Sequence, residues 1–308
     1  MRVVLCGKNA AAVSCLNFLK KRGDAVWAIG NRTDDGRDGW QPSLKGAAGR
    51  LGMPFSQPPS INHGEFIERL AAFSPDRLIS IQYDQILKGA LFAKIGAPCL
   101  NLHFSLLPRH RGVAPIAWAI LSGDDEAGAT LHHMVEGIDE GDVIAGQRVR
   151  ILPDDTARAL YDKVSDAAIS LFEKSYPFSP ALLERRMPQT AGMASYHRAG
   201  DFDFSQRRVD WKQPAENLQR WIRAMIFPPL QYPEVSLEGQ TFYVTRIAET
   251  MGRPGTHAPG TVVSRTGQRL EVAAADGTIR ITGMEKPSAP SQAPRGLPAS
   301  VAMGARFD

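Results

Sequence analysis

Residues 1–30 constrain the fold most, because they place one helical pattern between two short apolar runs. Residues 2–6 and 25–29 are apolar runs of strand length, and residues 11–21 carry their apolar side chains at helical spacing. Two strands joined through a helix form a β-α-β unit, in which the strands run parallel. The sequence therefore predicts an α/β fold with a Rossmann-like, mostly parallel sheet. The turn at residues 7–10 lacks the G-x-G-x-x-G pattern, so a dinucleotide site is not indicated.

The C-terminal part of the chain follows a different pattern. From residue 234 to residue 282, short runs of strand length alternate with glycine-containing turns. This spacing is typical of a small antiparallel β-barrel of the OB type. We therefore expect a catalytic Rossmann-like domain over residues 1–204 and a β-barrel-like domain over residues 205–308. The Pro/Ala-rich tail from residue 287 onward is expected to be poorly ordered.

Composition excludes several classes of protein. The chain has 308 residues, of which 43% are apolar and 22% charged, so it can bury a sizeable core and comfortably form two domains. A net charge of +4 permits an anionic ligand but is far from the charge of a dedicated nucleic-acid binder. No apolar run has the length of a transmembrane helix, and the one at the N-terminus is too short for a signal peptide.

The cysteines and histidines indicate the compartment and argue against a metal site. Cys6, Cys15 and Cys99 show no C-x-x-C spacing, and their odd number favours reduced thiols in a cytoplasmic protein. No group of histidine, cysteine and carboxylate residues has the spacing of a metal site. His132 and His133 are adjacent, so on a strand they would face opposite sides. We therefore expect no metal cofactor.

The stretch most indicative of chemistry is residues 101–112, Asn-Leu-His-Phe-Ser-Leu-Leu-Pro-Arg-His-Arg-Gly. Asn101 and His103 stand two apart at the end of an apolar, strand-like run, so their side chains project from the same face. Open α/β sheets bind ligands at the C-terminal ends of their strands. An amide that stabilises an oxyanion, beside an imidazole that moves a proton, suits chemistry at a carbonyl group.

A carboxylate would complete such a site, and Asp139 is the candidate. It lies between Gly137 and Gly141, where two predicted strands, residues 129–135 and 143–150, meet in a hairpin tip. A hairpin tip can aim an acidic side chain at a site. Each residue also has a structural interpretation when taken alone. A strand-end histidine is often only packed, and an aspartate between glycines is a common turn residue.

A wider pattern favours the chemical interpretation. The motif Asn-x-His-x-Ser-Leu-Leu-Pro-x-x-Arg-Gly is followed by Gly128-x-Thr-x-His132 and then by Gly137-Ile-Asp-x-Gly-Asp142. This arrangement resembles the 10-formyltetrahydrofolate-dependent formyltransferase family, strongly over residues 75–150 and loosely over nearly the whole chain. The longer members that it resembles are the methionyl-tRNA formyltransferases and the enzymes that formylate nucleotide-linked 4-amino-sugars, and the latter look closer.

The resemblance implies an enzyme with a defined set of catalytic residues. The co-substrate would be 10-formyltetrahydrofolate, without a metal. Asn101 would donate a hydrogen bond to the tetrahedral oxyanion. His103 would take or relay the proton of the acceptor amine and protonate the departing folate nitrogen. Asp139 would orient His103 or hold its charged form.

The resemblance also implies where the folate binds. Its pterin would lie mainly on backbone groups of two segments, which comprise Gln85, Ile86, Leu87, Val135, Glu136, Gly137 and Ile138. One position departs from the family pattern, because Val113 stands where close amino-sugar formyltransferases carry an arginine that helps to bind the folate. Either this contact is lost, or another cation such as Arg109 replaces it.

The acceptor has to be inferred from the loops around the motif. Residues 34–40, Asp-Asp-Gly-Arg-Asp-Gly-Trp, are not basic, whereas the tRNA enzymes carry a basic loop after the second strand for phosphate contacts. Trp40 either offers a stacking face or belongs to a solvated loop. Residues 189–197 resemble members that formylate sugars or hydroxyornithine. Tyr196 and His197 would then contact the acceptor, or else form a linker packed on the first domain.

We therefore expect a small amine as the acceptor, with a nucleotide-linked amino-sugar as the first candidate. N-hydroxyornithine and methionyl-tRNA are alternative acceptors, although a nucleic acid is not the expected partner. A hydrolase that releases formate from formyltetrahydrofolate is a further alternative, because water can replace the amine at the same three residues. No membrane partner is expected, and the sequence leaves open whether the protein forms a homodimer.

Overall fold

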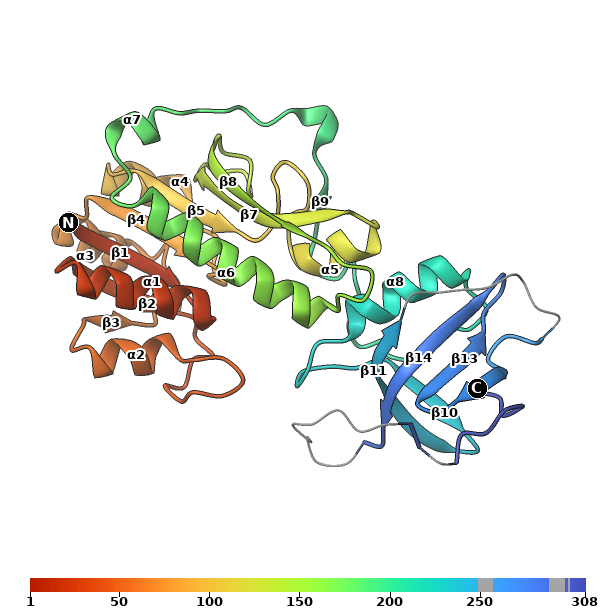
Figure 1. Cartoon of the computed structure of the whole chain (residues 1–308). Helices are drawn as coiled ribbons and strands as arrows, with labels where there is room; N and C mark the ends of the chain where they lie inside the picture. Colours follow the sequence, from red (N-terminus) through yellow and green to blue (C-terminus); the bar gives the residue numbers. More distant parts are fainter. Residues whose placement is uncertain (249–256, 288–296, 299) are drawn as a thin grey trace. The chain divides into compact units, whose positions relative to one another are not determined.

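The computed structural model describes residues 1–248, 257–287, 297–298 and 300–308. The chain forms two compact units, whose elements are drawn in Figure 1. The first unit comprises Met1–Pro115, Ala127–Val149 and Lys163–Arg198, and the second comprises Ile116–Glu126, Arg150–Asp162 and Ala199–Asp308. The domain limits at residues 204 and 205 stay a prediction.

A seven-stranded sheet forms the centre of the first unit, with the strand order β3-β2-β1-β4-β5-β7-β8. Strands β1 to β5 pair in parallel, whereas β7 runs antiparallel to β5. The prediction of a Rossmann-like, mostly parallel sheet is therefore confirmed. The strands are β1 (Arg2–Gly7), β2 (Ala25–Gly30), β3 (Phe55–Ser56), β4 (Arg77–Ile81), β5 (Cys99–His103), β7 (Glu126–His133) and β8 (Val143–Arg150).

Helices cover both faces of this sheet. Because its parallel strands are buried on both sides, their sequences are continuous apolar runs. On one face, Phe18 packs against Phe172 and Tyr176, with ring centroids 6.0 and 5.6 Å apart. On the other face, Trp27 packs against Phe66 and Phe73 at 5.8 and 5.6 Å. The helices outside the C-terminal segment are α1 (Asn9–Lys21), α2 (Leu44–Arg50), α3 (Gly64–Phe73), α4 (Gly89–Ile95), α5 (Pro115–Leu121), α6 (Ala157–Ser175) and α7 (Pro180–Leu183), followed by the 3₁₀ turn η1 (Ala191–Met193).

The C-terminal segment forms a curled antiparallel sheet with the strand order β10-β11-β14-β13-β12. Phe242 and Val244 alternate with partly exposed residues along β11 and are buried, together with Leu218 and Ile222 of the preceding helix. The predicted small antiparallel barrel is confirmed as a half-barrel. Its elements are α8 (Ala215–Met225), β10 (Glu234–Leu237), β11 (Gln240–Ala248), β12 (Val262–Thr266), β13 (Arg269–Ala273) and β14 (Thr278–Glu285).

The end of the chain corrects one expectation. Residues 288–296 and 299 of the predicted poorly ordered tail lie outside the described residues. In the described part, Val301 and Phe307 are 0% and 2% exposed, and the Phe307 ring stacks on Trp211 at 5.8 Å. The prediction of disorder is wrong for this last stretch, because its apolar side chains complete the core of the half-barrel.

Candidate active site

The end of β5 and the connection between β7 and β8 bring Asn101, His103 and Asp139 together. Asn101 Nδ2 donates a hydrogen bond to Asp139 Oδ1 at 3.1 Å, and His103 Nδ1 lies 3.5 Å from Asp139 Oδ2. The side chains of His103 and Asp139 are 9% and 10% exposed. An amide, an imidazole and a carboxylate therefore meet at one largely buried point, at the C-terminal end of a central strand.

A fourth side chain, His132 of β7, belongs to the same cluster. His132 Nε2 lies 3.0 Å from Asn101 Nδ2 and 3.5 Å from Asp139 Oδ1. The adjacent His133 points to the opposite side and contacts the Leu183 carbonyl oxygen at 3.0 Å. Reasoning from the sequence placed His132 within the family pattern but assigned it no role. The strand pairing gives it that role, because His132 stands opposite Asn101 on the neighbouring antiparallel strand.

The loop that carries Asp139 is held in place by several hydrogen bonds. Asp139 has a positive φ of 55°, and its Oδ2 accepts a hydrogen bond from the Gly112 amide at 2.9 Å. Gln189 Nε2 donates to the Asp139 carbonyl oxygen at 2.7 Å and to the Gly141 carbonyl oxygen at 2.8 Å. The Oε1 of Gln189 accepts from the Arg111 guanidinium. Gln189 therefore links the two loops that frame the cluster.

The hydrogen-bond partners of the two imidazoles assign their tautomers. His103 Nε2 lies 2.9 Å from the His110 carbonyl oxygen, and His132 Nδ1 lies 2.8 Å from the His133 carbonyl oxygen. A carbonyl oxygen only accepts, so each of these nitrogens carries a hydrogen. The basic nitrogen of neutral His103 is then Nδ1, which faces Asp139. His132 Nε2 can accept the hydrogen bond from Asn101.

Burial and neighbouring charges shift the pKa values of both His103 and Asp139. Burial lowers the pKa of His103, and the Asp139 carboxylate opposes this shift only in part. Burial alone would raise the pKa of Asp139, but His103, His132 and the Gly112 amide hold it well below its usual range. At neutral pH the site therefore pairs a neutral imidazole with a carboxylate, which is the state a general base requires.

The cluster opens into a cavity of about 480 Å³. This volume is within the range of small-molecule sites. Asn101, His103, Asp139 and Tyr196 line it, and so does every residue of the two segments predicted to hold the pterin: Gln85, Ile86, Leu87, Val135, Glu136, Gly137 and Ile138. Trp40, Arg109 and His197 are not among the lining residues, and Arg109 is exposed. Val113 lines the cavity with 48% of its surface exposed.

The first of the predicted pterin segments is fixed by the stretch before α3. Gln85 Oε1 accepts from the Ile61 amide at 2.7 Å, and its Nε2 donates to the Pro58 carbonyl oxygen at 3.0 Å. Asn62 Nδ2 donates to the Ile86 carbonyl oxygen at 2.8 Å. Because these contacts order the segment, its backbone is presented to the cavity in one conformation.

Residues 196 and 197 are attached to the motif loop. Strands β6 (Arg111–Gly112) and β9 (Tyr196–His197) pair in parallel. The His197 ring stacks on His110 with centroids 5.4 Å apart, and their facing nitrogens are 3.1 Å apart. Tyr196 is 46% exposed and lines the cavity, while His197 supports the loop that His103 contacts. Of the two, only Tyr196 is placed to contact a substrate directly.

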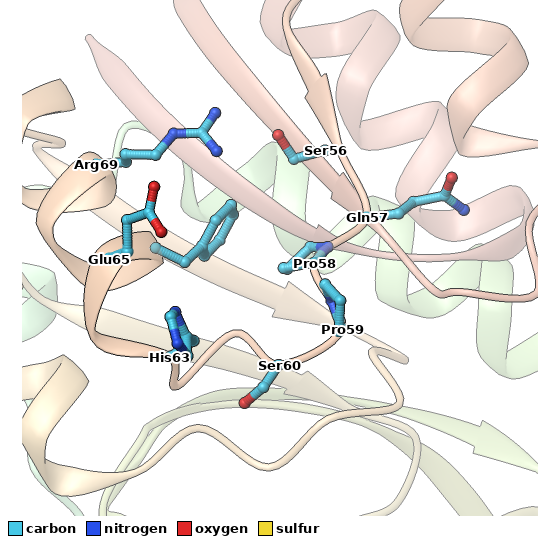
Figure 2. Close-up of a pocket in the computed structure, with 9 residues that line it drawn as sticks. Ser56, Gln57, Pro58, Pro59, Ser60, His63, Glu65 and Arg69 are labelled. Carbon is cyan, nitrogen blue, oxygen red and sulfur yellow. The ribbon is translucent and has the colours of Figure 1, made fainter.

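A second cavity, of about 490 Å³, lies between the segment after β3 and helix α3 (Figure 2). Its labelled side chains include Glu65 and Arg69 of the helix and Ser56 on the facing segment. The Arg69 guanidinium lies 5.4 Å from the ring centroids of both Trp27 and Phe66. None of the predicted site residues lines this second cavity. The cavity that contains Asn101, His103 and Asp139 is therefore the candidate active site.

Neither a metal-binding group nor a membrane-spanning helix is found among the described residues. Within them, no three histidine, cysteine or carboxylate side chains are grouped so that they could hold a metal ion. Over the same part of the chain, no helix combines the length and the apolar character needed to cross a membrane.

Comparison with known proteins defines the family. The formyl transferase model matches residues 42–175, and the model of the formyl transferase C-terminal domain matches residues 203–295. A methionyl-tRNA formyltransferase from Myxococcus xanthus is 34% identical over 292 residues, which cover 92% of this chain and 90% of that protein. The chain therefore belongs to the formyl transferase family. The prediction of a formyltransferase dependent on 10-formyltetrahydrofolate is confirmed.

Two solved structures share the fold over nearly the whole chain. The sugar 3N-formyl transferase WlaRD, in the presence of dTDP and 5-N-formyl-THF, has a TM-score of 0.74 and covers 94% of this chain and 99% of its own. The N-formyltransferase from Helicobacter canadensis, in complex with folinic acid and dTDP-3-aminofucose, has a TM-score of 0.71, covering 92% and 98%. Both are 24% identical to this chain, so the similarity shows the fold.

Proposed function

We propose that this enzyme transfers a formyl group from 10-formyltetrahydrofolate to the amine of a small acceptor, with a nucleotide-linked amino-sugar as the first candidate. The observation that carries the proposal is the cavity of about 480 Å³ in which Asn101, His103 and Asp139 converge. The two segments that the family resemblance assigns to the pterin flank the same cavity. A folate held by these segments would lie in the same cavity as the catalytic groups, as a direct transfer requires.

The geometry supports one assignment of roles in this reaction. The neutral amine attacks the formyl carbon, and a new C–N bond forms as the bond to the folate nitrogen breaks. His103 takes the amine proton on Nδ1 and delivers it to the departing nitrogen, so that it ends the cycle neutral. While the proton is on Nδ1, the Asp139 carboxylate at 3.5 Å stabilises the imidazolium.

Asn101 is the donor best placed for the oxyanion that develops on the formyl oxygen. Its Nδ2 hydrogens point to Asp139 and to His132 at 3.1 and 3.0 Å. One of these bonds must open, or be shared, when the formyl oxygen takes a hydrogen bond from the amide. The bond to the His132 imidazole is the weaker of the two, because the bond to the carboxylate is charge-assisted. We therefore assign the amide hydrogen that faces His132 to the substrate oxygen.

The loop between β2 and α2 supports a small acceptor. Asp34 accepts hydrogen bonds from the Gly36 and Lys45 amides at 3.1 and 3.0 Å, and from Ser43 Oγ. Asp38 lies 3.4 Å from the Arg50 guanidinium. The acidic side chains thus shape this loop and offset its arginines, which leaves little excess charge for a phosphate backbone.

Methionyl-tRNA is the second candidate, and a charge asymmetry favours it. Residues 1–204 contain 23 basic and 23 acidic side chains, whereas residues 205–308 contain 13 basic and 9 acidic ones. The whole net charge of +4 therefore belongs to the C-terminal segment. A positive surface there would attract nucleic acid. The relative from Myxococcus xanthus is itself a methionyl-tRNA formyltransferase.

A panel of acceptors tests the proposal. The protein is incubated with 10-formyltetrahydrofolate and, separately, with dTDP-3-aminofucose, N-hydroxyornithine or methionyl initiator tRNA. Tetrahydrofolate release and the mass of the acceptor are followed. We expect formylation of the amino-sugar at a rate at least tenfold above that of the tRNA. Transfer to the tRNA alone would overturn the small-acceptor proposal, and formate release without any amine would indicate a hydrolase.

A further inference from the structure

The lining of the catalytic cavity includes two polar residues that the proposed chemistry does not use, Ser80 and Lys8. Ser80 of β4 lines the cavity and is 6% exposed. It is the register partner of Asn101 on the neighbouring strand, so the two side chains stand next to each other on the same sheet face. The Ser80 hydroxyl makes no hydrogen bond with any residue that the structure describes. Because this residue lines the cavity and its hydroxyl has no partner among the described residues, the hydroxyl is available to a ligand.

Lys8 lies at the start of α1 and lines the same cavity as Ser80. Its amide donates to the Ile81 carbonyl oxygen at 3.3 Å. A Cβ on Gly7 would lie 2.5 Å from that same oxygen, so only glycine lets the turn pack this closely against the end of β4. The backbone of Lys8 is thereby held against Ile81, the residue that follows Ser80.

The Lys8 ammonium has no direct carboxylate partner within the described part of the chain. Lys8 has no ion pair there, and among the described lining residues it is the one lysine or arginine. The carboxylates that line the cavity are Asp84, Glu136 and Asp139. Lys8 also occupies the N-cap of α1 without a side-chain cap, where the helix dipole favours an anion. A negatively charged substrate group in this cavity would therefore be attracted to Lys8.

We propose that Ser80 and Lys8 form the acceptor subsite, which takes an amine that also carries an anionic group. The Ser80 hydroxyl accepts a hydrogen bond from the reacting amine beside Asn101, and Lys8 binds the phosphoryl or carboxylate group of the same molecule. That the ligand of this subsite carries an amine rests on the proposed function. That the ligand also carries an anionic group rests on the charge of Lys8.

Kinetics of two variants test the subsite. Lys8→Met removes the charge, and Lys20→Met is the matched control, since Lys20 is an exposed lysine at the far end of the same helix. With dTDP-3-aminofucose as acceptor, we expect Lys8→Met to raise the acceptor KM about 10- to 100-fold, the effect of losing a hydrogen bond to a charged group. The KM for the folate donor should stay within about threefold in both variants. A rise in the folate KM alone would assign Lys8 to the donor and overturn the proposal.

Ser80→Ala should lower kcat/KM for the acceptor about tenfold, which is the loss of a neutral hydrogen bond. Ser80→Thr keeps the hydroxyl and should recover most of the rate. Unchanged kinetics in Ser80→Ala would remove Ser80 from the subsite.

A binding measurement decides the proposal even if the wild-type protein formylates none of the small amines. Protein saturated with 5-formyltetrahydrofolate is titrated with inorganic pyrophosphate as the phosphoryl probe and with L-ornithine as the carboxylate probe, and binding is followed by NMR. We expect one of the two probes to bind the wild-type and Lys20→Met proteins and to bind Lys8→Met at least tenfold more weakly. The probe that binds identifies the anion class. Binding of neither probe to the wild-type protein, or equal binding to Lys8→Met, overturns the subsite.

Discussion

Two sets of polar residues in the catalytic cavity differ in how their side chains are satisfied. One is the set around Asp139, called here the linked end, and the other is Lys8 with Ser80, called the open end. Around Asp139, each side chain has a protein partner: Asn101, His103 and His132 lie within 3.5 Å of its carboxylate. At Lys8 and Ser80, no such partner occurs among the described residues. Preorganised polar groups stabilise a transition state without reorganising, whereas unpaired ones are completed by a ligand. The first end is therefore built for the reaction and the second for recognition of the acceptor.

This difference predicts that changes at the linked end act on kcat, while changes at the open end act on the acceptor KM. The variants below test the linked end, and Lys8→Met and Ser80→Ala test the open end. If a variant of the linked end raised only the acceptor KM and left kcat unchanged, this proposed difference would be wrong.

The largest effect is expected from His103→Ala. The variant loses the base that moves the amine proton, so kcat should fall by roughly 10²–10⁴-fold. Steady-state rates with 10-formyltetrahydrofolate and the best acceptor measure this effect. His63→Ala is the control, because His63 is exposed and lines the second cavity instead. A comparable loss in His63→Ala would move the active site to that second cavity.

Asn101→Ala removes the proposed oxyanion donor and should lower kcat by roughly 10²–10³-fold. The folate KM should change little, because the ground-state formyl oxygen gains less from the donor than the oxyanion does. Asn17→Ala, on the exposed side of α1, serves as the matched asparagine control. A variant that kept full kcat would show that another group stabilises the oxyanion.

Gln189→Ala tests whether the linked end depends on the clamp between its two loops. Without the Gln189 side chain, the Asp139 and Gly141 carbonyl groups lose their shared donor. We expect kcat to fall about tenfold, less than the roughly 10²-fold that a displacement of one ångström can cost. The exposed Gln206→Ala should behave like the wild-type protein. A Gln189→Ala protein with unchanged kcat would mean that the Gly112 amide alone positions Asp139.

The smallest effect is a shift in the pH profile. His103 must be neutral to act as the base, and burial lowers its pKa, so kcat should be lost only as the pH falls below the usual histidine value of about 6.5. Asp139 raises the His103 pKa, so Asp139→Asn should move this acidic limb to a still lower pH. Profiles of kcat against pH for both proteins measure the shift. A limb that moved upward would mean that Asp139 does not face the titrating group.

Much of the fold could be predicted from the sequence, because local patterns determine it. The β-α-β start predicted the parallel sheet, and short strands with glycine turns predicted the half-barrel. Disorder was predicted wrongly for the last stretch of the tail, residues 300–308, because composition cannot reveal that Val301 and Phe307 have a core to enter. The antiparallel pairing of β5 and β7 is a long-range contact that no local pattern specifies.

The site could be predicted in part, and the limit has a physical cause. Asn101, His103 and Asp139 belong to a motif whose spacing is recognisable. His132 and Gln189 act through contacts between distant segments, which appear only when the chain has folded. Lys8 and Ser80 are ordinary residues of a turn and a strand, and only the fold places them in the cavity. Trp40, Arg109 and His197 had attractive chemistry but lie outside the cavity lining.

The central claim is that Asp139 acts through His103, as one linked unit that moves the proton. The most direct test is a double-mutant cycle of His103→Ala and Asp139→Ala, with kcat for formyl transfer from 10-formyltetrahydrofolate as the readout. We predict that the double variant is no slower than His103→Ala alone, because Asp139 has no imidazolium left to stabilise. Losses that multiply across the two single variants would contradict the claim and show that Asp139 acts on the substrate independently.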